Sequence, residues 1–362
     1  MTLGTTAHDS RLSRLSMSEK SNHMNFLSYI DKDIGTVFQK YVSAIWNFSR
    51  PHTIIGSALS LVCLYLFATP SSVWFTSTFI KALLNAALPA LLTNLYVTGL
   101  NQLTDTEIDK VNKPYLPLAS GALSYTQGLL IVVLCFMWSL NLVKDASWPL
   151  RMTVYGSAIL GTLYSMPPFR LKRFPLFAAM SIIVVRGTLV NLGFFLDAKS
   201  SVMGVAVGDT IGAVLGTALQ FPEAIAATAY FAIFGTIIAI MKDVPDIIGD
   251  RLFSIPSFSV QLGAARVFTF AWQLLFSLLS IGSIACFSAF LTPILAGQSL
   301  VGRTGTMASR LVAGALLGFL GKDVRKRASV VKAEDSESVF KYYMHLWNVF
   351  YACYVIMPFL RT

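Results

Sequence analysis

The sequence predicts an all-α membrane protein with about nine transmembrane helices. Of its 362 residues, 55% are hydrophobic and only 13% are charged, whereas soluble domains carry roughly 25% charged residues. The mean hydropathy is +0.64, and the shortage of charge extends through most of the chain. Because the apolar runs are long and unbroken, they favour helices over the short alternating strands of a membrane β-barrel.

Each expected span is an apolar run long enough to cross a bilayer, whose hydrocarbon core requires ~20 helical residues. In order along the chain, the spans lie near 53–69, 78–100, 124–142, 149–165, 176–196, 223–242, 264–289, 303–321 and 338–359. The stretch 201–223 differs from these runs, because it is rich in glycine and interrupted by Asp209. We interpret it as a loop or an interfacial segment, with a re-entrant hairpin as the alternative.

The segment before the first span, 1–45, is polar and has no apolar core of the kind found in secretory signals. Its serines, together with Arg11 and Arg14, are also typical of organelle-targeting sequences. We interpret this segment as disordered or as the remnant of a targeting sequence, and 46–362 as a single transmembrane domain. The four cysteines show neither disulfide nor metal-ligand spacing, so we expect them to be buried packing residues.

The positive charges predict an orientation for the spans. The formal net charge is +10, and alternating the nine spans places most lysines and arginines on one side. That side holds the N-terminus and the loops after the even-numbered spans. The positive-inside rule therefore places it in the cytosol, or in the stroma or matrix of an organelle.

Two acidic motifs follow even-numbered spans, so both are expected on this positive side. In NQLTDTEIDK (101–110), Asn101, Asp105 and Asp109 are four residues apart and would share one face of a helix. In KDVPDIIGDR (242–251), three aspartates also share one face, and Pro245 indicates a broken or newly started helix. These aspartates are Asp243, Asp246 and Asp250.

The two acidic arrays predict a binding site for a cation and a phosphate. Carboxylates beside hydrocarbon are energetically costly and usually face a cavity or a partner. The alternative, that they are only polar helix ends in water, would explain one aspartate better than five. Mg²⁺ suits such arrays, because it binds a few carboxylates and completes its shell with water and phosphate oxygens. A proton or cation pathway is the alternative. The flanking cations oppose cation transit and favour an anionic phosphate ligand; they are Lys110, Lys113, Lys242 and Arg251.

A basic stretch, YSMPPFRLKR (164–173), ends the fourth span on the same side. Arg170 and Lys172 are either contacts for a diphosphate or ordinary flanking charges, and Arg173 is interpreted as a flanking charge. Tyr164 is placed to reach the same cavity or, alternatively, to act as an interfacial anchor.

The two acidic motifs, N-Q-x-x-D-x-x-x-D and K-D-x-x-D-x-x-G-D, resemble those of the UbiA superfamily of intramembrane prenyltransferases. The resemblance is to the plant-type homogentisate and flavonoid/coumarin aromatic prenyltransferase group, and it runs from about residue 46 to the end. Further matching stretches are FSRPHTIIGS, NKPYLPLASG, YSMPPFRLKR, VVRGTLVNLGFF and YYMHLWNVFYACYVIMPFLR. Cys353 and the glycine-rich 201–223 depart from many homogentisate enzymes and favour a specialised phenolic acceptor.

The resemblance implies a helical bundle around a central cavity, in which both motifs hold Mg²⁺ ions that bind a prenyl diphosphate. It implies transfer of the prenyl group from an allylic prenyl diphosphate to an electron-rich phenolic ring. A C–C bond would form by carbocation-like electrophilic aromatic substitution, with release of diphosphate. The implied partners are the prenyl diphosphate, the phenolic acceptor and the lipid bilayer, with no nucleic acid. The implied location is a plastid membrane, with the motifs facing the stroma or cytosol.

The resemblance also implies roles for individual residues. The expected Mg²⁺ ligands are Asp105, Asp109, Asp243 and Asp250, and Asp246 would act through water or by orienting a cation. Asn101 would contact metal, diphosphate or acceptor. The expected diphosphate contacts are Arg170, Lys172 and Lys242, with Tyr164 at the same cavity.

Two arginines are expected to hold polar groups of the acceptor. Arg186 lies within a span, where a bare charge is expensive, so a place in the cavity is favoured. Arg50 is either a second acceptor contact or an arginine that snorkels from a helix end.

Two other functions stay open at the level of sequence. The first is a UbiA-like prenyltransferase with a non-phenolic acceptor, of the chlorophyll or haem type. The second is a polytopic transporter, which would have polar residues near the bilayer midplane and internal repeats. The acidic residues instead gather at one end of the expected spans.

Overall fold

The computed structural model describes residue 36, residues 38–297 and residues 304–360. The chain divides into two compact units, 1–47 and 48–362. In the first unit the described residues are helical, and most of the polar segment expected over 1–45 lies outside the described residues.

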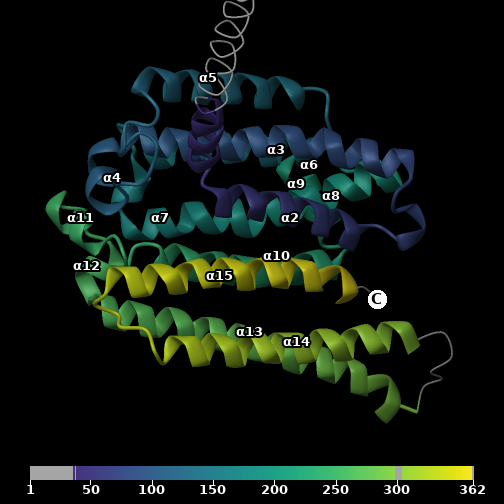
Figure 1. Ribbon diagram of the computed structural model, residues 1–362. Helices are drawn as coiled ribbons and strands as arrows, with labels where there is room; N and C mark the ends of the chain where they lie inside the picture. Colours follow the sequence, from purple (N-terminus) through teal and green to yellow (C-terminus); the bar gives the residue numbers. More distant parts are fainter. Residues whose placement is uncertain (1–35, 37, 298–303, 361–362) are drawn as a thin grey trace, which may run out of the picture. The chain divides into compact units, whose positions relative to one another are not determined.

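The second unit is helical throughout its described part, and no strand occurs there (Figure 1). Its longer helices are α2 (Pro51–Ala68), α3 (Ser77–Thr104), α5 (Tyr125–Leu142), α6 (Trp148–Ser165), α8 (Val190–Met203), α10 (Pro222–Met241), α13 (Ala264–Leu295), α14 (Thr304–Ala328) and α15 (Ser336–Ile356). Its shorter elements are η1 (Ser71–Val73), α4 (Thr106–Asn112), η2 (Leu171–Arg173), α7 (Pro175–Ile182), η3 (Ile183–Leu189), α9 (Ile211–Ala218), α11 (Ile247–Leu252), α12 (Phe258–Leu262) and η4 (Met357–Leu360).

Within the described residues, each range expected to span the membrane falls largely on helical segments, but the number nine is not confirmed as a number of spans. Among the described residues, six helices are long and apolar enough to cross a membrane. They are α2, α3, α5, the continuous run 175–203 formed by α7, η3 and α8, α10 and α13. The helices α6, α14 and α15 are not among them, and α14 in particular carries several charged residues in its last turns.

Local sequence signals explain where several helices begin. Pro51, Pro175 and Pro222 stand at the first positions of their helices, where a missing N–H costs nothing. Ser124 and Gln127 form a reciprocal capping box at the start of α5. These signals place the helix starts within a few residues of the expected ones.

The stretch 201–223 was expected to be a loop or an interfacial segment, and its central part forms a short helix, α9, so the loop alternative is wrong there. Thr210 caps α9 by accepting a hydrogen bond from the N–H of Ala213. Val214 is buried, whereas Ile211 on the same helix is exposed. The alternative of a re-entrant hairpin is also wrong, because the stretch contains a single short helix that is followed by α10.

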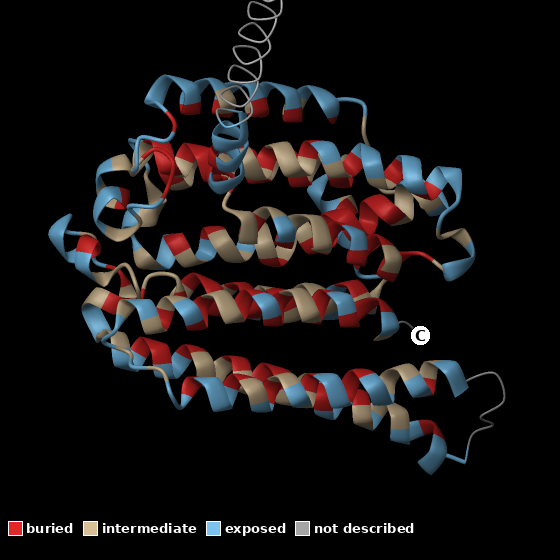
Figure 2. Ribbon diagram, viewed as in Figure 1, coloured by how far each residue is buried: buried red, intermediate tan, exposed pale blue. Residues whose placement is uncertain are grey.

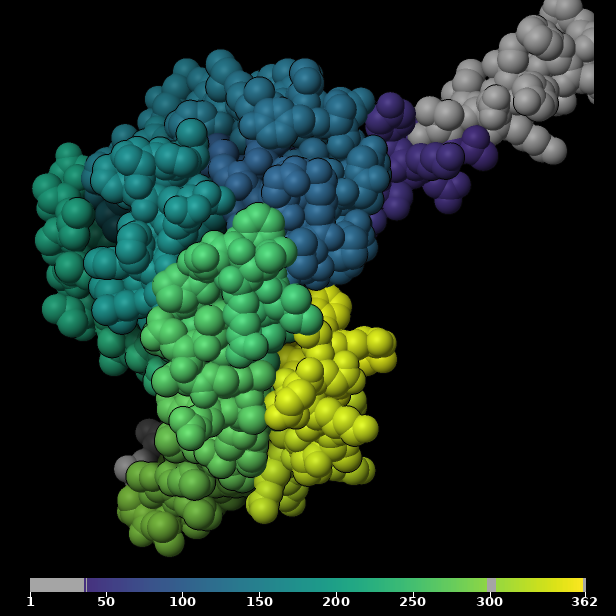
Figure 3. All heavy atoms as spheres, turned by 90° about the vertical axis from the view of Figure 1, so that its left-hand side faces the viewer, coloured from purple at the N-terminus to yellow at the C-terminus, as the bar shows by residue number. Residues whose placement is uncertain are grey.

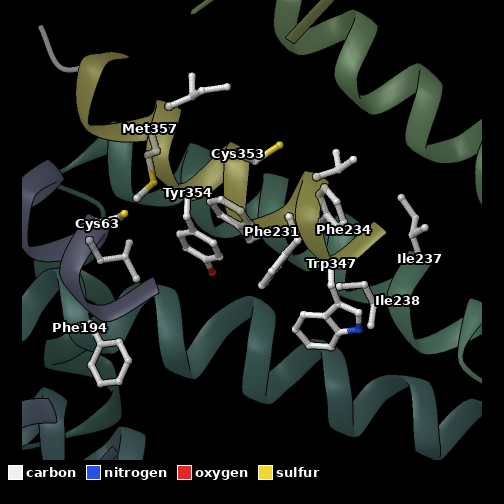
Figure 4. Packing of buried hydrophobic residues seen from close by; sticks show 14 of the residues in the cluster. Cys63, Phe194, Phe231, Phe234, Ile237, Ile238, Trp347, Cys353, Tyr354 and Met357 are labelled. Carbon is white, nitrogen blue, oxygen red and sulfur yellow. The ribbon is translucent and has the colours of Figure 1, made fainter. Parts of the chain in front are cut away.

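Aromatic side chains of α10 and α15 form the centre of the core (Figure 4). The ring of Phe231 stacks on that of Tyr354, with centroids 3.7 Å apart and an interplanar angle of 7°. Trp347 meets the edge of Phe350 one turn away. The four cysteines are free and buried, as expected.

The outer helices have exposed faces (Figure 2), and large apolar side chains lie among the exposed residues. Examples are Trp138 on α5, Ile281 on α13 and Phe319 on α14, each more than half exposed. Exposed apolar surface on this scale is typical of a membrane or partner contact.

The segments that carry the two acidic motifs lie at one end of the bundle. α3 leads into α4, and α10 leads into α11 and α12, at the left of Figure 1. Figure 3 shows that end from outside, with the blue segment after α3 against the green segment after α10.

Candidate active site

Both acidic motifs lie at this end of the bundle, and in each the helix breaks within the motif. α3 ends at Thr104 and α4 begins at Thr106, so Asp105 stands at the junction with non-helical dihedral angles. The spacing of the first motif predicted one continuous helical face. The structure instead interrupts the helix at Asp105. In the second motif Asp246 caps α11 after α10 has ended at Met241, which agrees with the break expected at Pro245.

Asp105 is surrounded by cations from the basic stretch between α6 and α7. Arg170 Nη2 lies 3.1 Å from Asp105 Oδ1, and Lys172 Nζ lies 2.7 Å from Asp105 Oδ2. Asn101 donates to Asp105 Oδ2 at 3.2 Å. Burial lowers the pKa of Lys172 to about 8, although Asp105 acts in the opposite direction. The structure thus joins the basic stretch to the first motif.

Asp109 is buried and its Oδ2 atom has no hydrogen-bond partner. The Nη2 atom of Arg50 lies 4.0 Å away, which is an ion-pair distance but too long for a hydrogen bond. Burial raises the pKa of Asp109 to about 6. Arg50 also donates to Asn101 Oδ1 at 3.1 Å, so its guanidinium faces the first motif.

The second motif is held by lysines. Lys113, just after the first motif, forms an ion pair with Asp246. Lys242 lies 3.8 Å from Asp243 Oδ1 and donates a hydrogen bond to the hydroxyl of Tyr164. Tyr164 also lines the cavity beside the motifs.

Of the carboxylates of the second motif, Asp250 is buried and Asp243 is half-buried. Burial raises the pKa of Asp243 above its usual range, and it raises the pKa of Asp250 to about 7. Carboxyl groups with raised pKa values in a concave region are typical of functional sites.

A hydrogen bond that was not expected connects the two motifs. The backbone N–H of Gly249 donates to Asn112 Oδ1 at 2.9 Å. A Cβ atom on Gly249 would lie 2.3 Å from that oxygen, so only glycine leaves room for the amide. Asn112 follows Asp109 by three residues, and the only sequence signal for it was the asparagine of NKPYLPLASG.

A cavity of about 230 Å³ opens beside the motifs. Five expected site residues line it: Arg50, Asn101, Tyr164, Arg186 and Lys242. Its deeper wall combines apolar side chains with hydroxyl and amide groups, among them Asn94, Thr153 and Ser157. The aspartates, Arg170 and Lys172 are not part of this lining, but Asp105 contacts Asn101 and Asp243 adjoins Lys242.

Arg186 lies in η3, a π-helical segment inside the run 175–203. Its guanidinium carbon stands 5.0 Å from the centre of the Trp347 ring. Among the described residues no carboxylate forms an ion pair with Arg186, and its side chain lines the cavity. Single π-helical turns inside α-helices occur frequently at functional sites.

The carboxylate oxygens of the two motifs are suitable ligands for a hard cation, although the aspartates do not surround one point. Among the described residues no group of three or more histidine, cysteine, aspartate or glutamate side chains is placed to hold a metal ion. The reason is that Asp105, Asp243 and Asp246 are each paired with lysine or arginine. The unpartnered Oδ2 of Asp109 is a buried oxygen of the type that Mg²⁺ binds.

The chain resembles known proteins over most of its length. A model of the UbiA prenyltransferase family matches residues 57–349. The chain is 37% identical over 329 residues to homogentisate phytyltransferase 1, chloroplastic, of Arabidopsis thaliana, which covers 90% of this chain and 77% of that protein. It is 34% identical over 353 residues to homogentisate geranylgeranyltransferase of Triticum aestivum, covering 96% and 79%.

The fold has a counterpart of known structure. A UbiA homologue from Archaeoglobus fulgidus bound to DMAPP and Mg²⁺ superposes with a TM-score of 0.52 at 16% identity, over 87% of this chain and 98% of that chain. At this identity the likeness concerns the fold alone. The match of the family model over residues 57–349, together with relatives above 30% identity, shows that the chain belongs to the UbiA prenyltransferase family.

Proposed function

We propose that the protein transfers a prenyl group from an allylic prenyl diphosphate to an electron-rich phenolic ring in the presence of Mg²⁺. A C–C bond forms, the ring loses a proton, and diphosphate leaves. The observation that carries the proposal is the meeting of two aspartate motifs and a set of cations at one end of a largely apolar cavity. The names of the two homogentisate prenyltransferase relatives support a phenolic acceptor over a chlorophyll- or haem-type acceptor.

The aspartates would hold the metal. The proposed ligands are Asp105, Asp109, Asp243 and Asp250, with Asp246 acting through water or by orienting a cation. Bound Mg²⁺ would neutralise the diphosphate and make it a better leaving group. The Mg²⁺ and DMAPP bound to the homologue from Archaeoglobus fulgidus support this assignment.

The cations that now pair with aspartates would turn to the diphosphate. Arg170 and Lys172 hold Asp105, and Lys242 lies near Asp243. With the carboxylate oxygens bound to metal, these cations would be free to donate to phosphate oxygens, where charge develops as the C–O bond breaks. Tyr164, already bonded to Lys242, would hold that lysine in place.

The acceptor would lie in the cavity beside the allylic carbon. Arg50, Asn101 and Arg186 line this space and offer polar contacts to a phenol. The apolar part of the lining would exclude water, which would otherwise capture the carbocation-like carbon.

The location we propose is a plastid membrane, with the motif end facing the stroma or cytosol. The six apolar helices support insertion into a bilayer, and the chloroplastic relative supports the compartment. The distribution of lysine and arginine supports the orientation.

The test is an assay of the purified protein in lipid nanodiscs with geranylgeranyl diphosphate and a panel of phenolic acceptors, including homogentisate. We expect prenylated product with Mg²⁺ and none with EDTA. Asp105→Ala and Asp243→Ala should each lower turnover by at least about a hundredfold, the scale of losing a group that stabilises the transition state. Glu107→Ala is the matched control, because Glu107 is exposed and pairs only with Lys110. Full turnover in either aspartate variant would refute the mechanism.

A further inference from the structure

The helical run 175–203 changes its geometry at η3, where the backbone is π-helical. The N–H of Val190 donates to the carbonyl oxygen of Val185, five residues back, whereas an α-helix joins residues that are four apart. A turn that takes in one extra residue rotates the part of the run before it by about 100° relative to the part after it. The π-helical turn therefore sets the angle between the side chains on its two sides.

The site cavity is lined by residues within this turn and on both sides of it. Ser181 and Ile182 precede the turn, Arg186 lies within it, and Val190 and Phe194 follow it. A regular α-helix over the same residues would direct these side chains differently. The π-helical turn is therefore part of what places the Arg186 guanidinium at the cavity.

The side chain of Asn191 holds the end of the π-helical turn. Its amide nitrogen donates to the carbonyl oxygen of Arg186 at 2.6 Å and to that of Gly187 at 2.8 Å. Asn191 is buried, so these bonds are shielded from water. Both hydrogen atoms of the amide are thus bonded to the backbone of η3.

Tyr354 fixes the orientation of Asn191 from α15. The hydroxyl of Tyr354 donates to Asn191 Oδ1 at 2.8 Å, so the oxygen of the amide faces α15 and its nitrogen faces η3. The ring of Tyr354 is fully buried and stacks on Phe231 of α10. Tyr354 thereby connects the π-helical turn to both α15 and α10.

Trp347 contacts the side chain of the same arginine from the same helix. Trp347 and Tyr354 are seven residues apart, about two helical turns, so both project from one face of α15 (Figure 4). The guanidinium carbon of Arg186 lies 5.0 Å from the centre of the Trp347 ring. One face of α15 therefore meets the guanidinium directly and the backbone of Arg186 through Asn191.

The π-helical turn also packs closely against α10. A Cβ atom on Gly187 would lie 2.6 Å from the Cα atom of Ala232, so only glycine permits this approach. With α10 on one side and the Asn191 amide bonded to two of its carbonyl groups, the turn is held in place around Arg186.

We propose that Asn191 and Tyr354 are positioning residues for the acceptor, because they hold the π-helical turn that presents the Arg186 guanidinium to the cavity. This inference rests on the proposed function, in which Arg186 contacts the phenolic acceptor. Neither Asn191 nor Tyr354 lines the cavity, so both act through Arg186. Loss of either contact should weaken binding of the acceptor and leave binding of the prenyl diphosphate, which other residues hold, unchanged.

The first test removes a single hydroxyl group. Tyr354→Phe keeps the ring that stacks on Phe231 and deletes only the bond to Asn191, so the variant is expected to fold. In lipid nanodiscs the KM of the phenolic acceptor should rise by about two- to tenfold, the scale of losing one neutral hydrogen bond. The KM of the prenyl diphosphate should stay unchanged.

Tyr342→Phe is the matched control for this variant. Tyr342 is a buried residue of α15 whose hydroxyl donates to the carbonyl oxygen of Val324, on α14, at 3.2 Å. Its loss should lower the thermal stability about as much as Tyr354→Phe does, without changing the KM of the acceptor. An equal rise of that KM in both variants would show a general loss of structure and overturn the inference.

A double variant separates positioning of Arg186 from any other effect of Tyr354. In an Arg186→Gln background, Tyr354→Phe should raise the KM of the acceptor no further, because the guanidinium that it positions is gone. A further rise of the same size as in the wild-type background would overturn the inference. Asn191→Ala removes both bonds to the carbonyl groups and should raise the KM of the acceptor more than Tyr354→Phe does.

Hydrogen exchange measures the structural step without turnover. In Tyr354→Phe the backbone amides of 183–190 should exchange about two- to tenfold faster than in the wild type, and in Tyr342→Phe they should keep the wild-type rate. Unchanged exchange in Tyr354→Phe, or faster exchange with an unchanged KM of the acceptor, would overturn the inference. Faster exchange in a protein that prenylates no phenol would refute the proposed function instead.

Discussion

The side-chain oxygen of Asn112 accepts a hydrogen bond of 2.9 Å from the backbone N–H of Gly249. This bond joins the segment after the first aspartate motif to the second motif, and it uses neither a carboxylate nor a cation. The nearby ion pair between Lys113 and Asp246 also joins them, but it occupies a carboxylate that we propose acts through water or by orienting a cation. The Asn112–Gly249 bond can therefore hold the motifs at a constant separation while the ion pairs rearrange.

We predict that Asn112→Ala and Gly249→Ala each weaken Mg²⁺ activation. A neutral hydrogen bond contributes about 0.5–1.5 kcal/mol, so the Mg²⁺ concentration for half-maximal activity should rise by about two- to tenfold. Asn112→Asp, which keeps the acceptor atom, is the conservative control and should lie nearer to wild type. The double variant should be no worse than the poorer single variant, because both changes break one bond. Additive losses would contradict the shared contact.

Mg²⁺ binding should weaken in acid. Burial raises the pKa of Asp109 to about 6 and that of Asp250 to about 7. Below these values the carboxyl groups are protonated, and a proton must leave before the oxygen can bind metal. The apparent Mg²⁺ affinity should therefore fall by up to about tenfold per pH unit for each proton released, as pH drops through 7 and then 6.

Calorimetry in buffers of different ionisation enthalpy measures that proton release directly. At pH 6.5 the release on Mg²⁺ binding should be larger than at pH 8.5. A Mg²⁺ affinity that does not change between these two pH values would show that neither carboxyl group is a ligand.

Binding of the prenyl diphosphate should weaken in alkali. Burial lowers the pKa of Lys172 to about 8, so its positive charge is lost as pH rises through that value. The KM for the diphosphate should rise above pH 8, while that for the acceptor stays constant. Lys172→Arg should shift this rise to higher pH, because a guanidinium stays charged. An unchanged alkaline profile in Lys172→Arg would exclude Lys172 as the titrating group.

Acceptor binding should depend on Arg186. Its guanidinium lines the cavity beside Trp347 without a carboxylate partner among the described residues. Arg186→Gln should raise the KM of the phenolic acceptor by at least about tenfold, the scale of a hydrogen bond to a charged group, and leave the KM of the diphosphate unchanged. Arg151→Gln is the matched control, because Arg151 also stacks on a tryptophan, Trp148, but does not line the cavity. A parallel rise in the KM of the diphosphate would instead place Arg186 at the phosphate.

Much of the fold could be predicted because hydrocarbon imposes a length and a composition on any helix that crosses it. The expected range 176–196 lies within the helical run 175–203, and 264–289 lies within α13. The helix in 201–223 could not be predicted, since the eight residues of α9 are too few for a clear apolar period. The number of spans also stayed open, because α6, α14 and α15 mix apolar and polar residues.

The spacing of the site residues was visible in the sequence, but their pairing was not. Asn101, Asp105 and Asp109 were expected on one face, and the break at Asp105 instead turns that carboxylate toward Arg170 and Lys172. Asn112 was overlooked, because an asparagine three residues beyond a motif carries no pattern of its own.

The sequence by itself determined the helical class, the family and the identity of the acidic and basic side chains, because these depend on local composition and spacing. Only the tertiary structure decided which partner each side chain meets, as with Asn112 and Gly249, 137 positions apart along the chain. Such contacts depend on how helices pack and where they break, and distances across a bundle are not encoded in any single segment.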